Sequence, residues 1–333
     1  MNLLYLGLGV VLLLGVTIDL LWTTLWVEGG AGPLTHWLMT GLWGGFRTVS
    51  NQDSRVLRLA GPLVLLAELF MWVVLLWVGW TLVFASAGEI LIDTLNRGPI
   101  SWTEWLYFVG YTLFTLGNGD YAVQDGIWQI VAAVTALNGL VFLTLGATYF
   151  LSVLRAVTQK RAFAMGVTGL GTRSEAIVRS AWDGEGFQGL NLLLITYAAE
   201  LDTLTSNYKA YPILHYFYGQ QERWAPIIAV CLLDDTLTLL RFGVQEHKRL
   251  PNPIINNARS SVQNHLDVLS GTFIESADRT PPAPDLDSLR EAGVPVVNDE
   301  EFDEALEQLR ARRQDLLGLV EGDARQWSLL EGK

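Results

Sequence analysis

The sequence is poor in cysteine: Cys231 is the single thiol among 333 residues. One cysteine excludes a disulfide framework within the chain. Cys231 lies in an apolar helical pattern, and an unpaired cysteine in such surroundings usually behaves as a small core residue. We therefore expect a packed thiol and not a reactive one.

Basic residues are also scarce. The chain has 22 Lys and Arg against 34 Asp and Glu, a formal net charge of −12, with −9 in residues 161–333 and −3 in residues 1–160. No basic stripe is left that could follow a phosphate backbone, so the sequence predicts that nucleic acid is not a partner. No apolar segment has arginine at every third position, which excludes a voltage sensor of that type.

Patterns typical of enzymes and nucleotide-binding domains are missing. We find no nucleophile, base and orienting group in a recognisable arrangement, so we expect neither an enzyme nor a cofactor. The spacing Gly166-x-x-Gly169-x-Gly171 reverses that of the dinucleotide-binding fingerprint, and no alternating strand precedes it. These glycines instead predict a loose, flexible stretch.

Candidate metal ligands are few. Asp234 and Asp235, with Glu200 and Asp202, could bind a divalent cation if the fold brought them together. Charged residues mostly stay exposed, so solvated helix faces are the favoured interpretation of these acids. We therefore predict no metal beyond a permeant ion.

Long hydrophobic runs are what the sequence does have. Half of the residues are hydrophobic, and the mean hydropathy is +0.30. Residues 3–27 are interrupted only by Asp19, residues 63–85 only by Glu68, and residues 126–154 contain no charge. Each run can cross a hydrocarbon core of about 30 Å. We expect Asp19 to hydrogen-bond a neighbouring helix and Glu68 to pair with a nearby arginine, because a charge inside a span is costly.

The connector after the first run indicates the topology. Trp37 and Trp43 have helical spacing and are followed by Arg47, Arg55 and Arg58. Tryptophans and basic residues are typical of a helix that lies among lipid headgroups on the cytoplasmic side. We expect a multi-pass protein of the cell membrane with its N-terminus outside and its C-terminal domain in the cytoplasm.

A glycine-containing motif, Thr115-Leu116-Gly117-Asn118-Gly119-Asp120, lies between the aromatic-rich residues 102–114 and the third apolar run. Alternating glycines let a backbone stay extended with its carbonyls turned one way. At membrane depth, backbone that is not helical must be buried in protein or face a water-filled path. We therefore expect this segment to face a pore. An ordinary glycine-rich turn is the alternative interpretation.

The T-x-G-x-G-D pattern, between a short aromatic segment and an apolar helix, resembles the pore loop of potassium channels over about residues 61–155. The resemblance implies that carbonyls of a selectivity filter replace the water around the ion. It also implies a role for each of the following residues: Thr115, Leu116, Gly117, Asn118 and Gly119 as the ion-binding filter, Asp120, Tyr111, Tyr107 and Phe108 as its support, and Gly139 or Gly146 as the gating hinge.

Three residues depart from the family pattern. Phe114 precedes Thr115 where the family usually has Thr. Asn118 stands where the family has Tyr or Phe, and we expect it to be too short to reach the aromatic residues behind the filter, Tyr107 and Phe108. Tyr111 stands where relatives hydrogen-bond the aspartate, and we expect its phenol to reach Asp120. The resemblance therefore supports cation conduction more firmly than strict potassium selectivity, and a non-selective sodium and potassium channel is an alternative.

Polar residues mixed with apolar ones at helical spacing predict a helical second half. Four prolines indicate a linker at residues 280–299. Beyond it, a heptad-like helix with Arg313 in its apolar seam either ties subunits together or docks on its own domain.

One filter segment cannot close a ring, so we predict a homotetramer in membrane lipid. The expected fold is an all-α membrane protein: a potassium-channel-like pore module, an extra N-terminal transmembrane helix and an α-helical cytoplasmic domain that could bind an unknown ligand. A non-conducting, membrane-anchored signalling or scaffold protein is the alternative from another class. The predicted parts are an N-terminal helix (1–28), a connector (29–60), a pore domain (61–158) with outer helix (62–87), pore helix (101–114), filter (115–120) and inner helix (126–155), a helical domain (159–279), a linker (280–299) and a C-terminal helix (300–333).

Overall fold

The computed structural model describes residues 1–26, 29–50, 54–96, 98–219, 221–270, 276–323 and 325–327. The chain divides into two compact units. The first unit consists of Met1–Asn51, Leu59–Leu154 and Ala210–Tyr216, and the second of Gln52–Arg58, Arg155–Lys209 and Phe217–Lys333.

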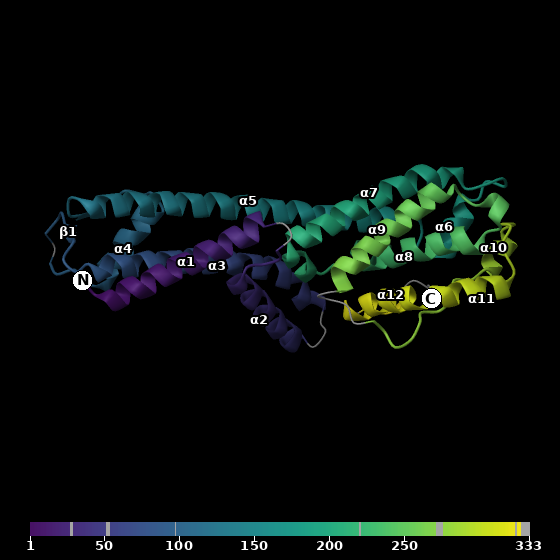
Figure 1. Ribbon diagram of the computed structural model, residues 1–333, viewed down its shortest axis with the longest axis horizontal. Coiled ribbons are helices and arrows are strands. Elements are labelled where there is room, and N and C mark those ends of the chain that lie inside the picture. Colours follow the sequence, from purple (N-terminus) through teal and green to yellow (C-terminus); the bar gives the residue numbers. More distant parts are fainter. Residues whose placement is uncertain are drawn as a thin grey trace. The chain divides into compact units, whose positions relative to one another are not determined.

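The first unit is built mostly from helices (Figure 1). Among the described residues, three segments are long and apolar enough to cross a membrane, as the sequence predicts: Leu3–Leu25, Leu59–Ala85 and Ile127–Leu170. Its helices and strands are α1 (Leu3–Leu25), α2 (Pro33–Ser50), α3 (Ser54–Ser86), β1 (Leu91–Asp93), α4 (Trp102–Leu113), β2 (Tyr121–Val123) and the first part of α5 (Ile127–Leu170).

Glycines let α1 and α3 pack closely. A Cβ atom at Gly9 would lie 2.8 Å from the carbonyl oxygen of Gly79, and one at Gly79 would lie 2.9 Å from the side chain of Leu13. Small residues at a crossing allow two membrane helices to approach backbone to backbone. The N-terminal helix is therefore an integral part of the first unit.

Asp19 hydrogen-bonds neighbouring helices, as expected from its place in a span. Its carboxylate accepts hydrogen bonds from the backbone N–H groups of Leu34 (2.7 Å) and Thr35 (3.2 Å), the Thr35 hydroxyl (2.6 Å) and the Trp72 indole (2.9 Å). Leu34 and Thr35 lie in the first turn of α2, where N–H groups lack partners within the helix and favour a negative charge. Asp19 thus ties α1 to α2 and α3.

The arginines of the predicted interfacial connector cannot be compared with the structure. The side chains of Arg47, Arg55 and Arg58 lie outside the described residues. Helix α2 is present between Pro33 and Ser50.

Two short strands depart from the all-α expectation. Strands β1 and β2 pair antiparallel, with Leu91 opposite Val123 and Asp93 opposite Tyr121. Each strand has three residues. Such a short strand shows too little alternation of apolar and polar residues to be found from a sequence. The two strands lie on either side of α4 and residues 115–119 along the chain.

The third apolar helix is longer than predicted. Helix α5 continues to Leu170 instead of ending near residue 155, so Gly166 and Gly169 belong to a helix and not to a loose stretch. Gly166 makes room for another helix, because a Cβ atom there would lie 2.9 Å from the ring of Tyr197. The Tyr197 hydroxyl donates a 2.9 Å hydrogen bond to the Gly166 carbonyl.

The second unit is helical, as predicted, and is organised around α8 (Pro226–Thr238). Every residue of this helix is buried, which its nearly continuous apolar sequence explains. Helices α6, α9 and α12 pack against it (Figure 1). The helices of this unit beyond α5 are α6 (Ser174–Ala181), α7 (Gln188–Ala210), α8, α9 (Asn252–Ser270), α10 (Asp287–Glu291), α11 (Asp299–Gln308) and α12 (Arg310–Gly322), with a π-helical turn at Leu239–Gly243 and 3-10 turns at Glu222–Trp224 and Glu246–Lys248.

Residues 280–299 are packed into the second unit and do not form the predicted linker. Pro281, Leu286, Leu289 and Val294 are buried, and this stretch contains α10. The predicted C-terminal helix is two helices, α11 and α12, with Leu309 between them. Of the two roles left open for it, docking on its own domain is the one the structure shows, because α12 contacts α8 and α9.

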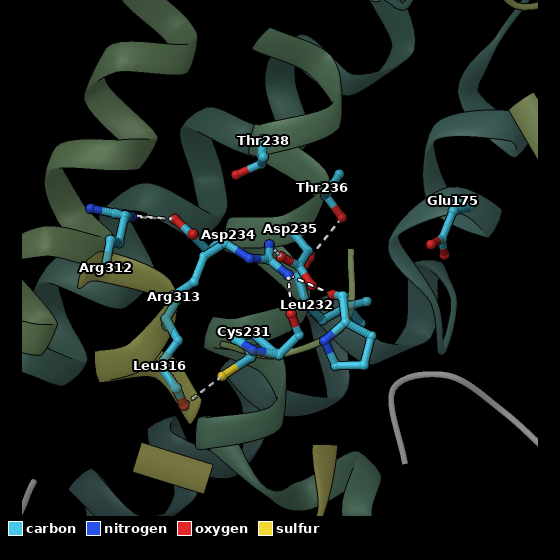
Figure 2. A network of polar contacts seen from close by, with 12 residues as sticks. Glu175, Cys231, Leu232, Asp234, Asp235, Thr236, Thr238, Arg312, Arg313 and Leu316 are labelled. Atoms are coloured by element: carbon cyan, nitrogen blue, oxygen red, sulfur yellow. Dashed lines mark hydrogen bonds and ion pairs between the residues drawn. The ribbon is translucent and has the colours of Figure 1, made fainter. Parts of the chain in front are cut away.

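Both interpretations of Asp234 and Asp235 are wrong. The two aspartates are 1% and 6% exposed, so they are not solvated. They pair with consecutive arginines of α12: Arg312 donates to Asp234 at 2.6 Å and Arg313 to Asp235 at 2.7 Å (Figure 2). In the described part of the chain, no cluster of three or more Asp, Glu, His and Cys residues could hold a metal.

Cys231 confirms the expectation of a packed thiol. It is fully buried, and its Sγ lies 3.7 Å from the carbonyl oxygen of Leu316 (Figure 2). Burial raises the pKa of the Cys231 thiol, which keeps it protonated. Burial likewise raises the pKa of Asp235 to about 7, against the opposing effect of the Arg313 guanidinium.

Candidate ion-conducting segment

Helix α4 begins with the capping box that the sequence predicts. The Ser101 hydroxyl accepts a 3.3 Å hydrogen bond from the backbone N–H of Thr103, and the Glu104 carboxylate accepts one of 2.7 Å from the backbone N–H of Ser101. These bonds satisfy donors that a helix start leaves without partners. They fix where α4 starts, and therefore also the position of its last residue, Leu113, from which residues 115–119 follow.

The chain leaves α4 through a tight turn. The N–H of Thr115 donates to the carbonyl of Thr112 at 3.1 Å, and the N–H of Leu116 donates to the carbonyl of Tyr111 at 2.8 Å. These two bonds anchor the beginning of residues 115–119 on the last turn of α4. The Phe114 ring packs edge-to-face on Trp77 of α3, with 5.9 Å between ring centroids.

The backbone of residues 115–119 alternates in the sign of φ. The angle is +57° at Thr115, +62° at Gly117 and +80° at Gly119, whereas Leu116 and Asn118 keep the negative φ usual for residues with side chains. Alternation of left-handed and ordinary conformations turns successive peptide groups in a common direction, whereas a plain strand turns them in opposite directions. Glycine adopts positive φ at little cost, which accounts for its spacing of two residues.

Four successive carbonyl groups of this segment have no hydrogen-bond partner among the residues that the structure describes. Among the described residues, none donates to the carbonyl oxygens of Thr115, Leu116, Gly117 or Asn118. All residues from 115 to 119 are exposed on the single chain. Backbone carbonyls that the fold leaves free are available to an ion or to another chain.

Asn118 reaches the aromatic residues behind the segment, contrary to expectation. Its Nδ2 donates a 2.8 Å hydrogen bond to the Tyr107 hydroxyl, and that hydroxyl lies 3.5 Å from the Asp120 carboxylate. The predicted pairing of Tyr111 with Asp120 is wrong, because Tyr107 takes this place. The shorter side chain still reaches because a tyrosine on α4 extends toward it.

Tyr111 and Phe108 belong to a buried aromatic cluster beneath the segment. The Tyr111 hydroxyl donates to the backbone carbonyl of Tyr121 in β2. Phe108 packs edge-to-face on Tyr111, at 5.5 Å between centroids, and on Phe84 of α3, at 5.1 Å. Edge-to-face aromatic pairs hold a fixed geometry. The cluster therefore connects α3, α4 and β2 on one side of residues 115–119.

Thr94 holds the far end of the segment and was not predicted. Its hydroxyl lies 3.0 Å from the carbonyl oxygen of Gly119 and 2.8 Å from that of Asp120, whose oxygen also accepts from the Thr94 N–H at 3.0 Å. The sequence offered no signal for this role, because Thr94 follows a strand too short to detect.

The two glycines proposed as hinges have different surroundings. A Cβ atom at Gly139 would lie 2.0 Å from the carbonyl oxygen of Leu113, so α5 touches the end of α4 there, backbone to backbone. A Cβ atom at Gly146 would lie 3.3 Å from the Leu69 side chain. Helix α5 is continuous through both positions. Asn138 accepts a 3.0 Å hydrogen bond from the Trp80 indole, which adds a second tie between α3 and α5.

Comparison with known proteins identifies the class. Residues 69–156 match a family model described as an ion channel, which confirms the resemblance seen in the motif and covers part of α3, α4, residues 115–119 and most of the apolar part of α5. The match supports an ion channel.

The chain is also 42% identical to the uncharacterized membrane protein YdjJ of Bacillus subtilis (strain 168), over 328 residues that make up 98% of this chain and 96% of that protein. It belongs to the same family of membrane proteins as YdjJ. No solved structure matches.

Proposed function

We propose that this protein is a homotetrameric cation channel, in which residues 115–119 of four chains form the selectivity filter. The observation that supports this most directly is the row of four carbonyl groups without partners, on a backbone that alternates in φ. Around a fourfold axis these oxygens would replace the water of a dehydrated cation. The match to an ion-channel family over the same residues supports the proposal.

Potassium is the proposed permeant ion, and sodium the alternative. Selectivity requires that the carbonyl oxygens keep their spacing while ions occupy the filter. The hydrogen bond from Asn118 to Tyr107 and the two contacts of Thr94 brace the segment on the single chain. This bracing favours the potassium-selective channel over the non-selective one, although Asn118 replaces the aromatic residue of the family pattern.

The proposed topology follows from the spans and the charges. With the N-terminus outside, α3 returns outward, residues 115–119 lead from membrane depth toward the extracellular end, and α5 leads into the cytoplasm. Arg155, Lys160 and Arg161 then lie on the inner side, where basic residues gather. The second unit would be the cytoplasmic domain of a cell-membrane protein surrounded by lipid.

A cytoplasmic ligand has a candidate location in the second unit. A cavity of about 320 Å³ is lined by charged side chains of Arg173, Glu175, Asp235 and Asp285, with Leu232 and Trp327 beside them. We propose this cavity as the place where an effector of the channel would bind.

Flux through purified protein in liposomes tests the channel. We expect potassium flux that a quaternary-ammonium ion blocks, with a reversal potential that follows the potassium gradient. A reversal potential that ignores the potassium gradient would leave only the non-selective channel, and the absence of any flux would favour a non-conducting scaffold.

Gly117→Ala provides the matched variant. A side chain at φ +62° is strained by about 1–2 kcal/mol. We expect at least a tenfold loss of flux with assembly unchanged. The control, Gly15→Ala, adds the same methyl group in α1, where nothing lies within 4 Å, and should leave flux unaltered. Equal flux from wild type and Gly117→Ala would contradict a filter at this position.

A further inference from the structure

Glu68 of α3 lacks the arginine partner that its place in a span predicts. Its side chain is fully buried, at 0% exposure. Neither Oε1 nor Oε2 makes a hydrogen bond or an ion pair with any described residue. Buried carboxyl groups nearly always have such partners, so an exception calls for a physical cause.

The surroundings of Glu68 come from several segments of the first unit. It is faced by Asp19 of α1, Thr35 of α2 and Tyr149 of α5. Tyr149 packs on Trp72 of α3 and on Tyr211, each at 5.9 Å between ring centroids. The titratable groups around Glu68 are thus one carboxyl and two phenols, and no cation is among the described groups that face it.

Asp19 cannot supply the missing partner. Its carboxylate is the acceptor of four hydrogen bonds from α2 and Trp72, which stabilise its negative charge. A second negative charge on Glu68, beside Asp19 and without a donor, would be strongly disfavoured in a buried site. Charge balance therefore requires a positive species at Glu68.

The size of the site decides which species that is. Glu68 Oε1, Glu68 Oε2 and the Tyr149 hydroxyl each expose less than 1 Å² of surface. A water molecule or a metal ion needs a space of roughly one water-sized sphere, and none borders these oxygens. Because the burial is already complete within one chain, lipid or another subunit cannot reach them.

We propose that Glu68 is a proton-binding site, at which the buried side chain is a neutral carboxylic acid beside Asp19 and Tyr149, between α3 and α5. The proton is the one cation that fits, and it removes the negative charge from Glu68. The site joins α1, α2, α3 and α5 with the segment Ala210–Tyr216. Removal of the proton leaves an unpaired charge beside Asp19, so these segments must separate to admit water. The inference does not depend on ion conduction.

Infrared spectroscopy of the full-length protein tests the site, with ¹³C-labelled glutamate to identify the C=O stretch of a protonated glutamic acid. At neutral pH we expect one such band that persists in wild type, disappears in Glu68→Gln and shifts in Tyr149→Phe. The control is Glu175→Gln. Glu175 is also buried, but it accepts from the Asp285 N–H at 2.8 Å and lies 3.6 Å from Arg173. This variant should keep the band.

The absence of a protonated-glutamate band in wild type would overturn the proposal, and so would a band that survives Glu68→Gln. If Glu68→Gln fails to fold, the wild-type band and its shift in Tyr149→Phe still decide the question. The amide of glutamine is neutral and similar in size, so we expect this variant to assemble as wild type does.

Discussion

The two units of the chain differ in the oxygen atoms that they leave without hydrogen-bond donors. In the second unit, Asp234 and Asp235 are buried and each has its own arginine on α12 (Figure 2). In the first unit, Glu68 has no donor, and the carbonyls of residues 115–118 have none among the described residues. Polar groups without partners cost free energy of folding. The comparison indicates that the second unit uses its polar contacts for stability, whereas the first leaves oxygens open where we propose cation and proton binding.

The largest effect that tests this comparison is expected from Arg313→Ala. The substitution removes the ion pair with Asp235 and the 2.6 Å hydrogen bond to the Pro282 carbonyl, and leaves the buried Asp235 carboxyl without its cation. We expect the free energy of unfolding to fall by about 3–5 kcal/mol, measured by denaturant titration of helical circular dichroism.

Arg310→Ala is the matched control, three residues away on the same helix. Arg310 pairs with Glu307 at 2.7 Å, but both side chains are more than half exposed. An exposed pair contributes at most about 1 kcal/mol. Equal losses from Arg310→Ala and Arg313→Ala would show that the buried pair has no special role.

Gly139→Ala is expected to have the next largest effect. The added methyl group would meet the Leu113 carbonyl at 2.0 Å, so α4 or α5 must move, at a cost of about 1–3 kcal/mol or more. We expect a lower unfolding temperature and loss of flux together. Gly146→Ala, which meets only the end of the Leu69 side chain, should change stability much less. A Gly139→Ala protein of normal stability with altered gating would instead support the hinge.

The pH dependence of the second unit gives an intermediate effect. Burial, together with the nearby Lys160 charge, lowers the pKa of His265 to about 3; the ring lies 2.9 Å from the Thr205 hydroxyl. An unfolded histidine has a pKa of about 6.5, so below that pH the unfolded chain binds a proton that the folded chain does not. Stability is therefore complete above about pH 6.5 and is lost as the pH falls toward about 3.

We expect a loss of about 2 kcal/mol between about pH 6.5 and about pH 5 from His265. The measurement is denaturant unfolding at each pH, compared with His265→Asn. The variant should have a lower free energy of unfolding at neutral pH, and that free energy should change less between about pH 6.5 and about pH 5. An identical acid slope in both proteins would assign the effect to other groups.

The smallest effect is expected from Tyr107→Phe. The substitution removes the oxygen that accepts the Asn118 hydrogen bond, a loss of about 1 kcal/mol at an exposed site. We expect unchanged assembly and a several-fold loss of discrimination between potassium and sodium, measured as a shift in reversal potential. Tyr5→Phe is the control, since the Tyr5 hydroxyl makes no hydrogen bond within the described residues. Unaltered selectivity in Tyr107→Phe would contradict the proposal that the hydrogen bond from Asn118 to Tyr107 stabilises the filter.

Much of the first unit could be predicted from the sequence. Hydrophobic length indicates the three spans, Ser101 and Glu104 the start of α4, and the glycine spacing the positive φ at Gly117 and Gly119. The contacts of Thr94 and the hydrogen bond from Asn118 to Tyr107 could not be predicted. They depend on side-chain reach across a turn and on strands of three residues, neither of which leaves a periodic pattern.

The second unit was less predictable. Four prolines indicated a linker, but proline also fits a packed irregular stretch whose backbone oxygens accept from a side chain, as the Pro282 carbonyl does from Arg313. Two adjacent aspartates predicted a solvated surface. Their arginine partners could not be recognised, because they lie 78 residues further along the chain. Pairing over such a distance depends on tertiary structure, which composition and local periodicity do not contain.

The return of Ala210–Tyr216 to the first unit limits how the protein can be dissected. This segment places Tyr211 against Tyr149, and His215 and Tyr216 against Trp43 of α2, with ring centroids 5.9, 6.1 and 5.3 Å apart. A truncation after Arg155 would keep α1, α3 and the first part of α5, yet remove the aromatic rings that pack on Trp43 of α2 and Tyr149 of α5. A fragment that ends at Arg155 would lack these seven residues of the first unit. They would have to be supplied, as a tethered or added peptide.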